Sequence, residues 1–164
     1  FFNILSIFFL FLYRPLAVAI IGGAFSLSRN EKFMKTSQKD ALQFFPNPKT
    51  ARDYLIHIDL PEFTCLCPVT GQPDFAEIAL DYIPNESCLE LKALKLYIWS
   101  YRKTAIFHEA VSNKILDDIL ECVTPRFARI TAKFNVRGGT YPIVTCIHRS
   151  PDWKPTTDTQ HLNL

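Results

Sequence analysis

Glycine is scarce in this chain of 164 residues, and its five glycines form no Gly-x-Gly-x-x-Gly motif. Gly22-Gly23 lies in an apolar N-terminal segment, and Gly138-Gly139 lies between two segments with strand-like patterns. A Rossmann dinucleotide-binding domain needs that motif where its first strand meets its first helix. The sequence therefore excludes a Rossmann site. It also contains no internal repeat and no low-complexity tract.

The chain beyond residue 33 has no excess of either charge. Of the 18 basic and 16 acidic residues in the whole sequence, residues 1–33 hold three basic ones (Arg14, Arg29 and Lys32) and one acidic one (Glu31). The remainder therefore has fifteen of each. Nucleic-acid binders usually carry a basic excess that displaces counterions from phosphates. Direct binding of nucleic acid is therefore disfavoured.

The cysteines are too few and too irregularly spaced for a disulfide scaffold or a zinc site. There are five, an odd number, and only Cys65 and Cys67 lie close together in the sequence. Their spacing is one residue short of a zinc knuckle, and no second pair complements it. We therefore predict no metal site, and a reducing compartment, the cytoplasm. The remaining cysteines and the histidines are scattered: Cys88, Cys122, Cys146, His57, His108, His148 and His161.

The N-terminal segment, residues 1–33, lacks an uninterrupted apolar run long enough to span a membrane. The run from residue 4 to residue 13 is too short, because a spanning helix needs roughly 20 apolar residues, and Arg14-Pro15 interrupts any longer one. A basic start typical of a signal peptide is also missing. The only methionine is Met34. We expect residues 1–33 to lie outside the fold, with Met34 as the favoured start of the protein.

The rest of the sequence alternates between strand and helix patterns. Residues 34–62 are polar and contain three prolines, which predicts a lead-in segment that lies over the domain. Residues 63–149 form the predicted domain, and residues 150–164 a loosely ordered tail. Period-two alternation predicts strands, and apolar residues three or four apart predict helices. The predicted strands are 62–68, 75–83, 127–136 and 140–148, and the predicted helices are 89–103, with Leu91, Leu94, Ile98 and Tyr101 on its core stripe, and 106–123.

The order of these elements is strand, strand, helix, helix, strand, strand. Because strands and helices come in blocks, the predicted class is α+β, with an antiparallel sheet and two helices on one of its faces. Gly138-Gly139 between the last two strands is a hairpin turn signal.

Cys67 is the one cysteine for which the sequence suggests chemistry. Cys65 and Cys67 share one parity of the first strand, and Cys67 stands at the strand's end, just before Pro68. A thiol at such an edge is accessible, and the turn at residues 70–73 returns Asp74 towards it. A cysteine chosen at random is more often a small core residue, and this alternative stays open for both thiols.

Four motifs in fixed order resemble a known enzyme family. They are CPVTGQPDF (residues 67–75), ELKALKLY (90–97), FHE (107–109) and RGG (137–139). Together they are similar to the short, single-domain NADPH-dependent 7-cyano-7-deazaguanine reductases, the nitrile reductases of queuosine biosynthesis. The resemblance runs from about Phe63 to Gly139.

The resemblance implies a tunnelling fold, which the family shares with GTP cyclohydrolase I, and a homo-oligomer with active sites between subunits. It implies NADPH as cofactor and 7-cyano-7-deazaguanine as substrate. It also implies a role for individual residues, but none for Cys65. Cys67 matches the nucleophile and Asp74 the proton donor; Leu89, Glu90, Leu91, His108 and Glu109 match substrate-binding residues, and Lys92 and Lys95 are candidates for the cofactor phosphates.

These residue types suit the reduction of a nitrile. A soft thiolate converts the nitrile into a covalent thioimide that accepts a hydride, and a carboxyl group moves the proton. Two hydrides then give the aminomethyl product. Glu90 and Glu109 are suited to the N–H donors of a guanine-like base, and Phe107 to stacking on its ring. Taken alone, an acidic residue at the start of a helix is also expected from the helix dipole.

Two other functions remain open at this point. One is a zinc-dependent cyclohydrolase of the same fold, which needs a ligand set that the scattered histidines do not supply. The other is a non-catalytic, membrane-tethered binding module, suggested by residues 1–33; no membrane contact is expected for the rest of the chain.

Overall fold

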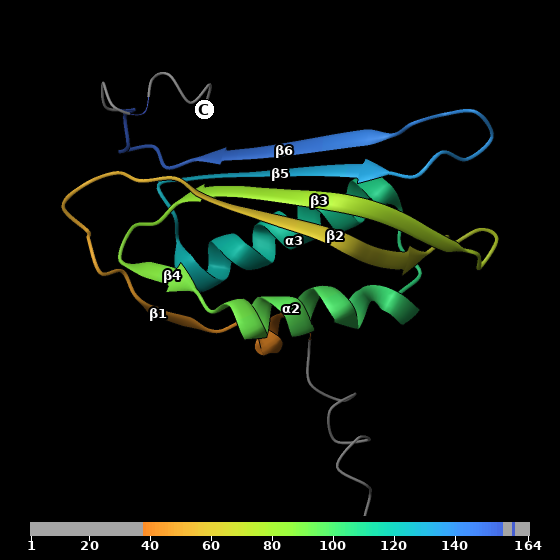
Figure 1. Cartoon of the computed structure of the whole chain (residues 1–164), viewed down its shortest axis with the longest axis horizontal. Coiled ribbons are helices and arrows are strands. Elements are labelled where there is room, and N and C mark those ends of the chain that lie inside the picture. Colours follow the sequence, from red (N-terminus) through yellow and green to blue (C-terminus); the bar gives the residue numbers. More distant parts are fainter. Residues whose placement is uncertain (1–37, 156–158, 160–164) are drawn as a thin grey trace, which may run out of the picture. The chain divides into compact units, whose positions relative to one another are not determined.

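A computed structural model describes residues 38–155 and residue 159 (Figure 1). The predictions for residues 1–33 lie outside the described residues. The elements follow in this order: η1 (Gln38–Ala41), β1 (Phe44–Pro46), β2 (Ile56–Leu66), β3 (Pro73–Ile83), β4 (Ser87–Leu89), α2 (Leu91–Ser100), η2 (Tyr101–Lys103), α3 (His108–Val123), β5 (Phe127–Phe134) and β6 (Ile143–Arg149).

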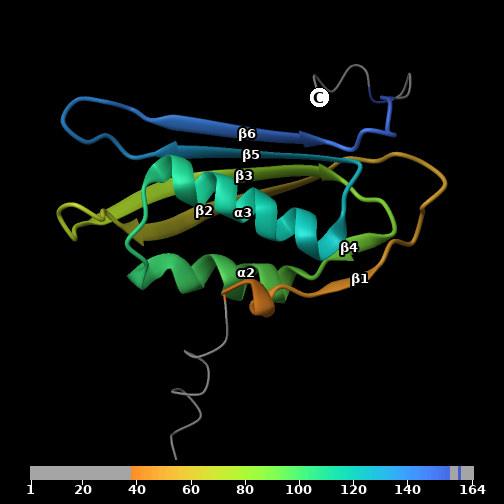
Figure 2. The ribbon, with the colours of Figure 1, turned by 180° about the vertical axis from the view of Figure 1, so that it is seen from behind.

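The main sheet has four antiparallel strands in the order β2-β3-β5-β6, and β1 pairs with β4 in a separate two-stranded sheet. Figure 1 views the main sheet from the face that the helices leave open, and Figure 2, seen from behind, shows α3 crossing in front of the strands. The predicted α+β class, with an antiparallel sheet and two helices on one face, is confirmed. None of the helices among the described residues is long and apolar enough to cross a membrane.

Two of the predicted boundaries differ from the structure. Strand β2 begins at Ile56, inside the segment predicted as a lead-in. The register of β2 against β3 shifts between Leu60 and Phe63, which marks a β-bulge at Pro61-Glu62. The bulge interrupts the period-two pattern, so the alternation of inward and outward residues in the first half of this strand is out of step with that in the second half. The C-terminal residues up to Trp153 are also tied to the domain, as described below.

The core lies between the helices and the sheet. Strand β3 buries alternate residues towards the helices. From the other side, α3 buries Val111, Ile115 and Ile119 against the sheet. Full burial of an aliphatic side chain of this size stabilises the fold by about 1.5–3 kcal/mol. The prediction of Leu91 on the core stripe of the first helix was wrong, because this side chain is 61% exposed. It occupies the first position of α2, at the end of the stripe, and is left uncovered there, whereas Leu94 and Ile98 of the same stripe are buried.

A buried polar network joins α2 to α3. The Tyr97 hydroxyl donates to Asp118 Oδ2 over 2.7 Å and lies 2.8 Å from the Tyr101 hydroxyl. Lys114 Nζ donates to the same carboxylate oxygen over 2.9 Å. Burial raises the pKa of both tyrosines, that of Tyr101 to about 12, so both phenols stay protonated. Because each member has a partner, the network fixes how the two helices pack without leaving an unsatisfied polar group.

A clasp of three side chains ties the segment before β2 to the segment after β6. Arg126 donates to Asp53 Oδ1 and to the Thr50 carbonyl, each over 2.6 Å. The Trp153 indole N–H donates to the other oxygen of Asp53 over 2.9 Å, and its ring packs against Phe127. The part of the tail next to the sheet is therefore ordered by specific contacts, which differs from the prediction of a loose tail.

Candidate active site

Cys67 directly follows β2 and opens a tight turn. Its N–H donates to the Gln72 carbonyl, and its carbonyl accepts from the Gly71 N–H, both over 2.8 Å. On the other side, Leu66 exchanges hydrogen bonds of 2.9 and 3.0 Å with Thr104 and Ile106, which extend the sheet at this point. The backbone around the thiol is therefore held from two sides.

The two thiols of this strand have opposite environments. Cys67 is partly exposed, and its pKa is lowered to about 7 by hydrogen bonds from the Thr70 hydroxyl, the Thr70 N–H and the Val69 N–H, with a further contribution from Arg137. Cys65 is 0% exposed, and burial raises the pKa of its thiol to about 11. At neutral pH a large fraction of Cys67 is therefore thiolate, the reactive form, whereas Cys65 is a packing residue.

Asp74 lies across the β2–β3 turn from Cys67. It lies on β3 directly opposite Cys65, and it is 4% exposed. One of its oxygens accepts from the Arg137 guanidinium, and the other lies 3.3 Å from His108 Nε2. A carboxylate that is buried between two nitrogen donors has a fixed orientation.

His108 opens α3 and closes the other side of this cluster. Its imidazole stacks on the Phe134 ring, with centroids 3.7 Å apart and planes 10° from parallel. The preceding residue, Phe107, is 57% exposed, and the next, Glu109, is also exposed. The start of α3 therefore places an imidazole against the Asp74 carboxylate, with an exposed aromatic ring before it and an exposed carboxylate after it in the sequence.

Comparison with known proteins shows the family of this chain. The family described as "QueF-like protein" matches residues 73–153. A protein of Alkalilimnicola ehrlichii called NADPH-dependent 7-cyano-7-deazaguanine reductase is 55% identical over 122 residues, which are 74% of this chain and 95% of that protein. A protein of the same name from Nitrosomonas europaea is 57% identical over 122 residues, which are 88% of its length. This chain belongs to the 7-cyano-7-deazaguanine reductase family.

A solved structure shows the fold of the family. The crystal structure of an archaeosine synthase, QueF-like, in the apo form matches 57% of this chain and 91% of its own, at 25% identity and a TM-score of 0.54. The tunnelling fold predicted from the sequence is thereby confirmed.

The family residues fall into two groups in a single chain. Cys67, Asp74 and His108 come together, with Glu109 next to them in sequence. Leu89, Glu90 and Leu91 instead lie at the start of α2, whereas the residues after its end pair with β2 beside Cys67. The length of α2, about 15 Å for ten residues, therefore separates the two groups.

Glu90 has a structural role within the chain. Its carboxylate caps α2 by accepting from the Lys92 N–H over 3.0 Å and from the Ala93 N–H over 2.6 Å. These two bonds lower the pKa of Glu90, so the cap stays charged. Leu89 is buried, whereas Lys92 and Lys95 extend from the exposed side of the same helix.

Arg137 is the site residue that sequence reasoning missed. It belongs to the RGG motif, but nothing in the sequence predicts a role for its side chain. It lies on the far hairpin, 63 residues from Asp74 in sequence, and the fold brings its guanidinium to the Asp74 carboxylate. The only signal in the sequence was its place directly before the Gly138-Gly139 turn.

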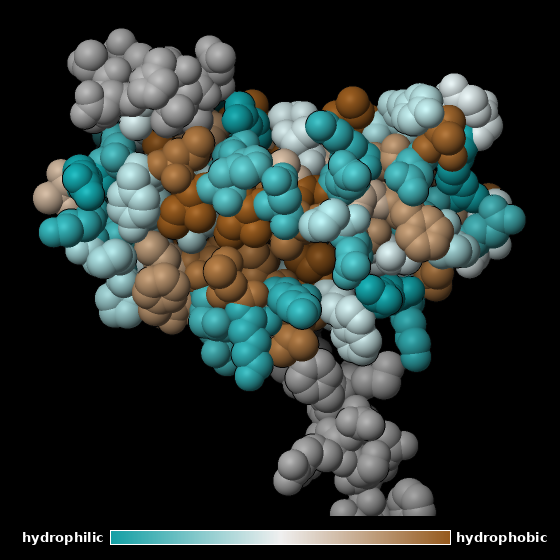
Figure 3. Space-filling model, in the orientation of Figure 1, coloured by the Kyte–Doolittle hydropathy of each residue, from teal (hydrophilic) through white to brown (hydrophobic). Residues whose placement is uncertain are grey.

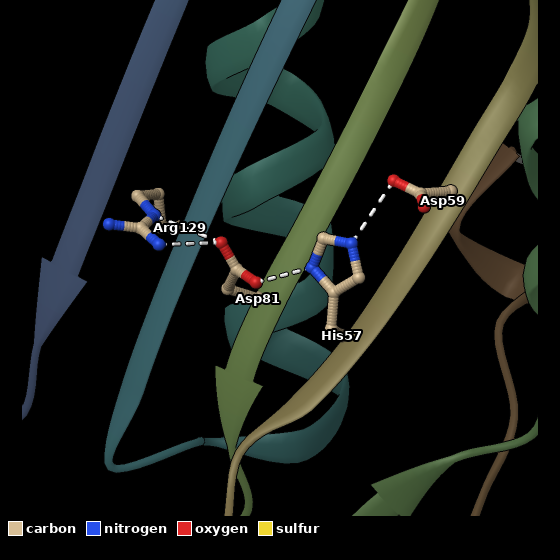
Figure 4. A network of polar contacts seen from close by, with 4 residues as sticks. All are labelled: His57, Asp59, Asp81 and Arg129. Carbon is tan, nitrogen blue, oxygen red and sulfur yellow. Dashed lines mark hydrogen bonds and ion pairs between the residues drawn. The ribbon is translucent and has the colours of Figure 1, made fainter. Parts of the chain in front are cut away.

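A second buried carboxylate lies on the other face of β3. Figure 4 shows Asp81 between Arg129, whose guanidinium donates over 2.8 Å, and His57 Nδ1 at 2.6 Å, with Asp59 on the far side of that imidazole. Burial alone raises the pKa of Asp81, but the bonds to His57 and Arg129 outweigh it, so the pKa is lowered. Among the described residues, no group of three or more His, Cys, Asp or Glu side chains is placed to hold a metal ion.

Proposed function

We propose that this protein reduces the nitrile of 7-cyano-7-deazaguanine to the primary amine, with NADPH as reductant and a covalent thioimide on Cys67 as intermediate. The observation that carries the proposal is the pairing of an accessible thiol, with a pKa near 7, and a buried, oriented carboxylate, both in contact with Arg137. The family relation supplies the substrate class. The relatives are named as NADPH-dependent reductases of this base.

The first step asks for a nucleophile and a proton. The Cys67 sulfur bonds to the nitrile carbon while the nitrile nitrogen takes up a proton, which turns the triple bond into a C=N double bond. In the fraction of Cys67 that is still protonated at neutral pH, Asp74 takes the proton of the thiol and returns it to this nitrogen. Positioned proton transfer of this kind contributes a factor of about 10²–10⁴ to the rate. The oriented carboxylate suits this transfer because Arg137 and His108 hold one oxygen each and the residue is shielded from water.

NADPH supplies the hydrides when bound, two for each nitrile. Lys92 and Lys95 suit its phosphates, since both ammonium groups are on the exposed side of α2, and neither forms an ion pair within residues 38–155. This chain's own contribution to the later steps would be to hold the carbon–nitrogen group beside Asp74 and to release the Cys67 sulfur as thiolate once the thioimide carbon has gained its first hydride. Loss of the sulfur re-forms a C=N bond as the imine, which the second hydride reduces to the amine.

The start of α3 suits the base. Glu109 accepts from paired N–H donors, and Phe107 offers an exposed ring for stacking. Glu90 suits the same role at the other end of α2. Each of its oxygens accepts one backbone N–H in the cap, and a carboxylate oxygen has room for a second donor. Glu90 can therefore bind a base without giving up its cap.

The separation of the two groups supports a site built from two chains. A bicyclic base is shorter than α2, so it does not reach from Cys67 to Glu90 of the same chain. A second copy that brings its own Leu89–Leu91 segment to the first chain's Cys67 solves this problem. The open face of the main sheet adds to the argument, since Figure 3 shows apolar side chains exposed on it among polar ones. We therefore infer a homo-oligomer with active sites between subunits.

One assay tests the proposed reaction directly. NADPH absorbance is followed after 7-cyano-7-deazaguanine is added to the purified chain. We expect two equivalents of NADPH consumed for each base, and the aminomethyl base as product. A chain that is folded but consumes no NADPH with this nitrile contradicts the proposal. One that consumes NADPH at the same rate without the nitrile does so as well.

Mixing two inactive variants tests the shared site. We expect Cys67→Ala and Glu90→Ala to be nearly inactive alone, and their mixture, after dissociation and reassembly, to regain activity. In random mixed pairs, about a quarter of the sites take both intact residues, so the regained activity is about a quarter of the wild-type value. The reassembled single variants are the controls. Activity that does not return, although mixed oligomers have formed, places both residues in one chain.

A further inference from the structure

Arg137 joins the two sides of the active-site cluster. One of its terminal nitrogens donates to Asp74, and the other donates to Gln72 Oε1 over 2.8 Å and lies 3.5 Å from the Thr70 hydroxyl. Thr70 is also the residue whose hydroxyl and N–H bond to the Cys67 thiol. A single guanidinium therefore contacts the carboxylate on β3 and the turn that surrounds the sulfur.

The hairpin holds the Arg137 backbone rigidly. Arg137 and Thr140 exchange backbone hydrogen bonds of 3.2 and 3.0 Å, and the Thr140 hydroxyl also donates to the Arg137 carbonyl. Gly138 and Gly139 between them have φ values of 56° and 81°. Two successive positive φ values define a type I′ turn, which glycine adopts without strain. The turn of the RGG motif thus directs the Arg137 side chain towards the β2–β3 turn.

Several parts of the chain surround the Cys67 thiol, and they differ in the charge that they bring to it. Asp74 on β3 contributes the negative charge, and His108 on α3 faces the far oxygen of that carboxylate. Cys65 lies behind on the same strand, and its thiol is protonated at neutral pH. The segment from Thr104 to Ile106 contributes no charge. Arg137 is the cation that contacts both partners of the proposed proton transfer.

We propose that Arg137 is a positioning residue, which holds the Asp74 carboxylate and stabilises the Cys67 thiolate before any ligand binds. The inference deepens the proposed function, on which its role in the reaction rests. It predicts two separable effects. The positive charge of Arg137 favours the thiolate, whereas its planar fork fixes the angle of the carboxylate. Lysine keeps the charge but loses the fork.

The test measures alkylation of Cys67 by iodoacetamide as a function of pH, in the full chain without NADPH or base, with the modified peptide identified by mass spectrometry. We expect a midpoint near pH 7 in the wild-type chain. Arg137→Gln raises the midpoint by about half a pH unit or more, because the thiolate loses a cation. Arg137→Lys keeps the midpoint low but lowers kcat. Arg149→Gln removes an exposed guanidinium at the far end of the sheet and changes neither.

Two outcomes overturn the proposal. In the first, Arg137→Gln leaves the alkylation midpoint where it is, for example with only the KM for NADPH increased, so that Arg137 is a cofactor contact. In the second, Arg137→Lys matches the wild-type chain in both midpoint and kcat, and this variant decides the matter alone if Arg137→Gln does not fold in a melting experiment. A shifted midpoint in a chain without reductase activity supports the positioning role and contradicts only the proposed reaction.

Discussion

Replacement of Cys67 by alanine is expected to abolish both NADPH oxidation and the covalent adduct with the nitrile base. The bond to the nitrile carbon needs a thiolate, and Cys67 is the thiol of this cluster that is both accessible and lowered in pKa. We expect turnover to fall below detection, and intact mass spectrometry to show no species heavier by one base. The wild-type chain, mixed with the base in the absence of NADPH, shows that species.

Cys65→Ala is the matched control for this experiment. It removes a thiol two residues away, on the same strand, that is fully buried and protonated at neutral pH. The loss of one buried sulfur is expected to cost about 1 kcal/mol of stability and to leave the adduct intact. If an adduct persists in Cys67→Ala, or disappears in Cys65→Ala although that chain is folded, Cys67 is not the nucleophile.

Asp74→Asn is expected to lower kcat by about 10²–10⁴ while the KM for the base changes little. Asparagine has the size of aspartate and still accepts a bond from Arg137, but it neither takes nor returns a proton. Adduct formation slows as well, because the nitrile nitrogen must be protonated as the sulfur adds. Rapid-quench kinetics with mass detection measures this step apart from turnover.

Asp81→Asn separates loss of chemistry from loss of stability. Asp81 is a buried aspartate that is paired with an arginine and a histidine (Figure 4), as Asp74 is. It lies on the same strand, towards the end away from Cys67, and on the opposite face. Its substitution is expected to lower the melting temperature with kcat retained. Equal losses of kcat in Asp74→Asn and Asp81→Asn contradict a special role for Asp74 in proton transfer.

Local patterns predicted most of the elements but not all of their ends. Alternation along β3 and helical spacing along α3 are strong signals, because each element buries one continuous face. Strand β2 was found only in its second half, since the bulge at Pro61-Glu62 changes which parity faces the core. The short β1 and β4 pair has three residues in each strand, too few for any period to be visible.

The candidate site was predictable to the extent that it is local in sequence. Cys67 and Asp74 lie on two sides of one turn, so their approach follows from the hairpin alone. The contact of Arg137 with Asp74 depends instead on how the β5–β6 hairpin is placed against the β2–β3 turn, which no local pattern encodes. The sequence placed Glu90 at the start of a helix, as the helix dipole favours, but its side-chain cap and its distance from the thiol emerge only from the packed helix.

The clasp around Asp53 bears on how this protein can be cut. Its carboxylate is shared by an arginine that directly precedes β5 and an indole that follows β6. A fragment trimmed to residues 63–149 strips the guanidinium of its counter-ion and uncovers the Phe127 ring. Crystallisation fragments and purification tags should therefore leave the stretch between Thr50 and Trp153 untouched.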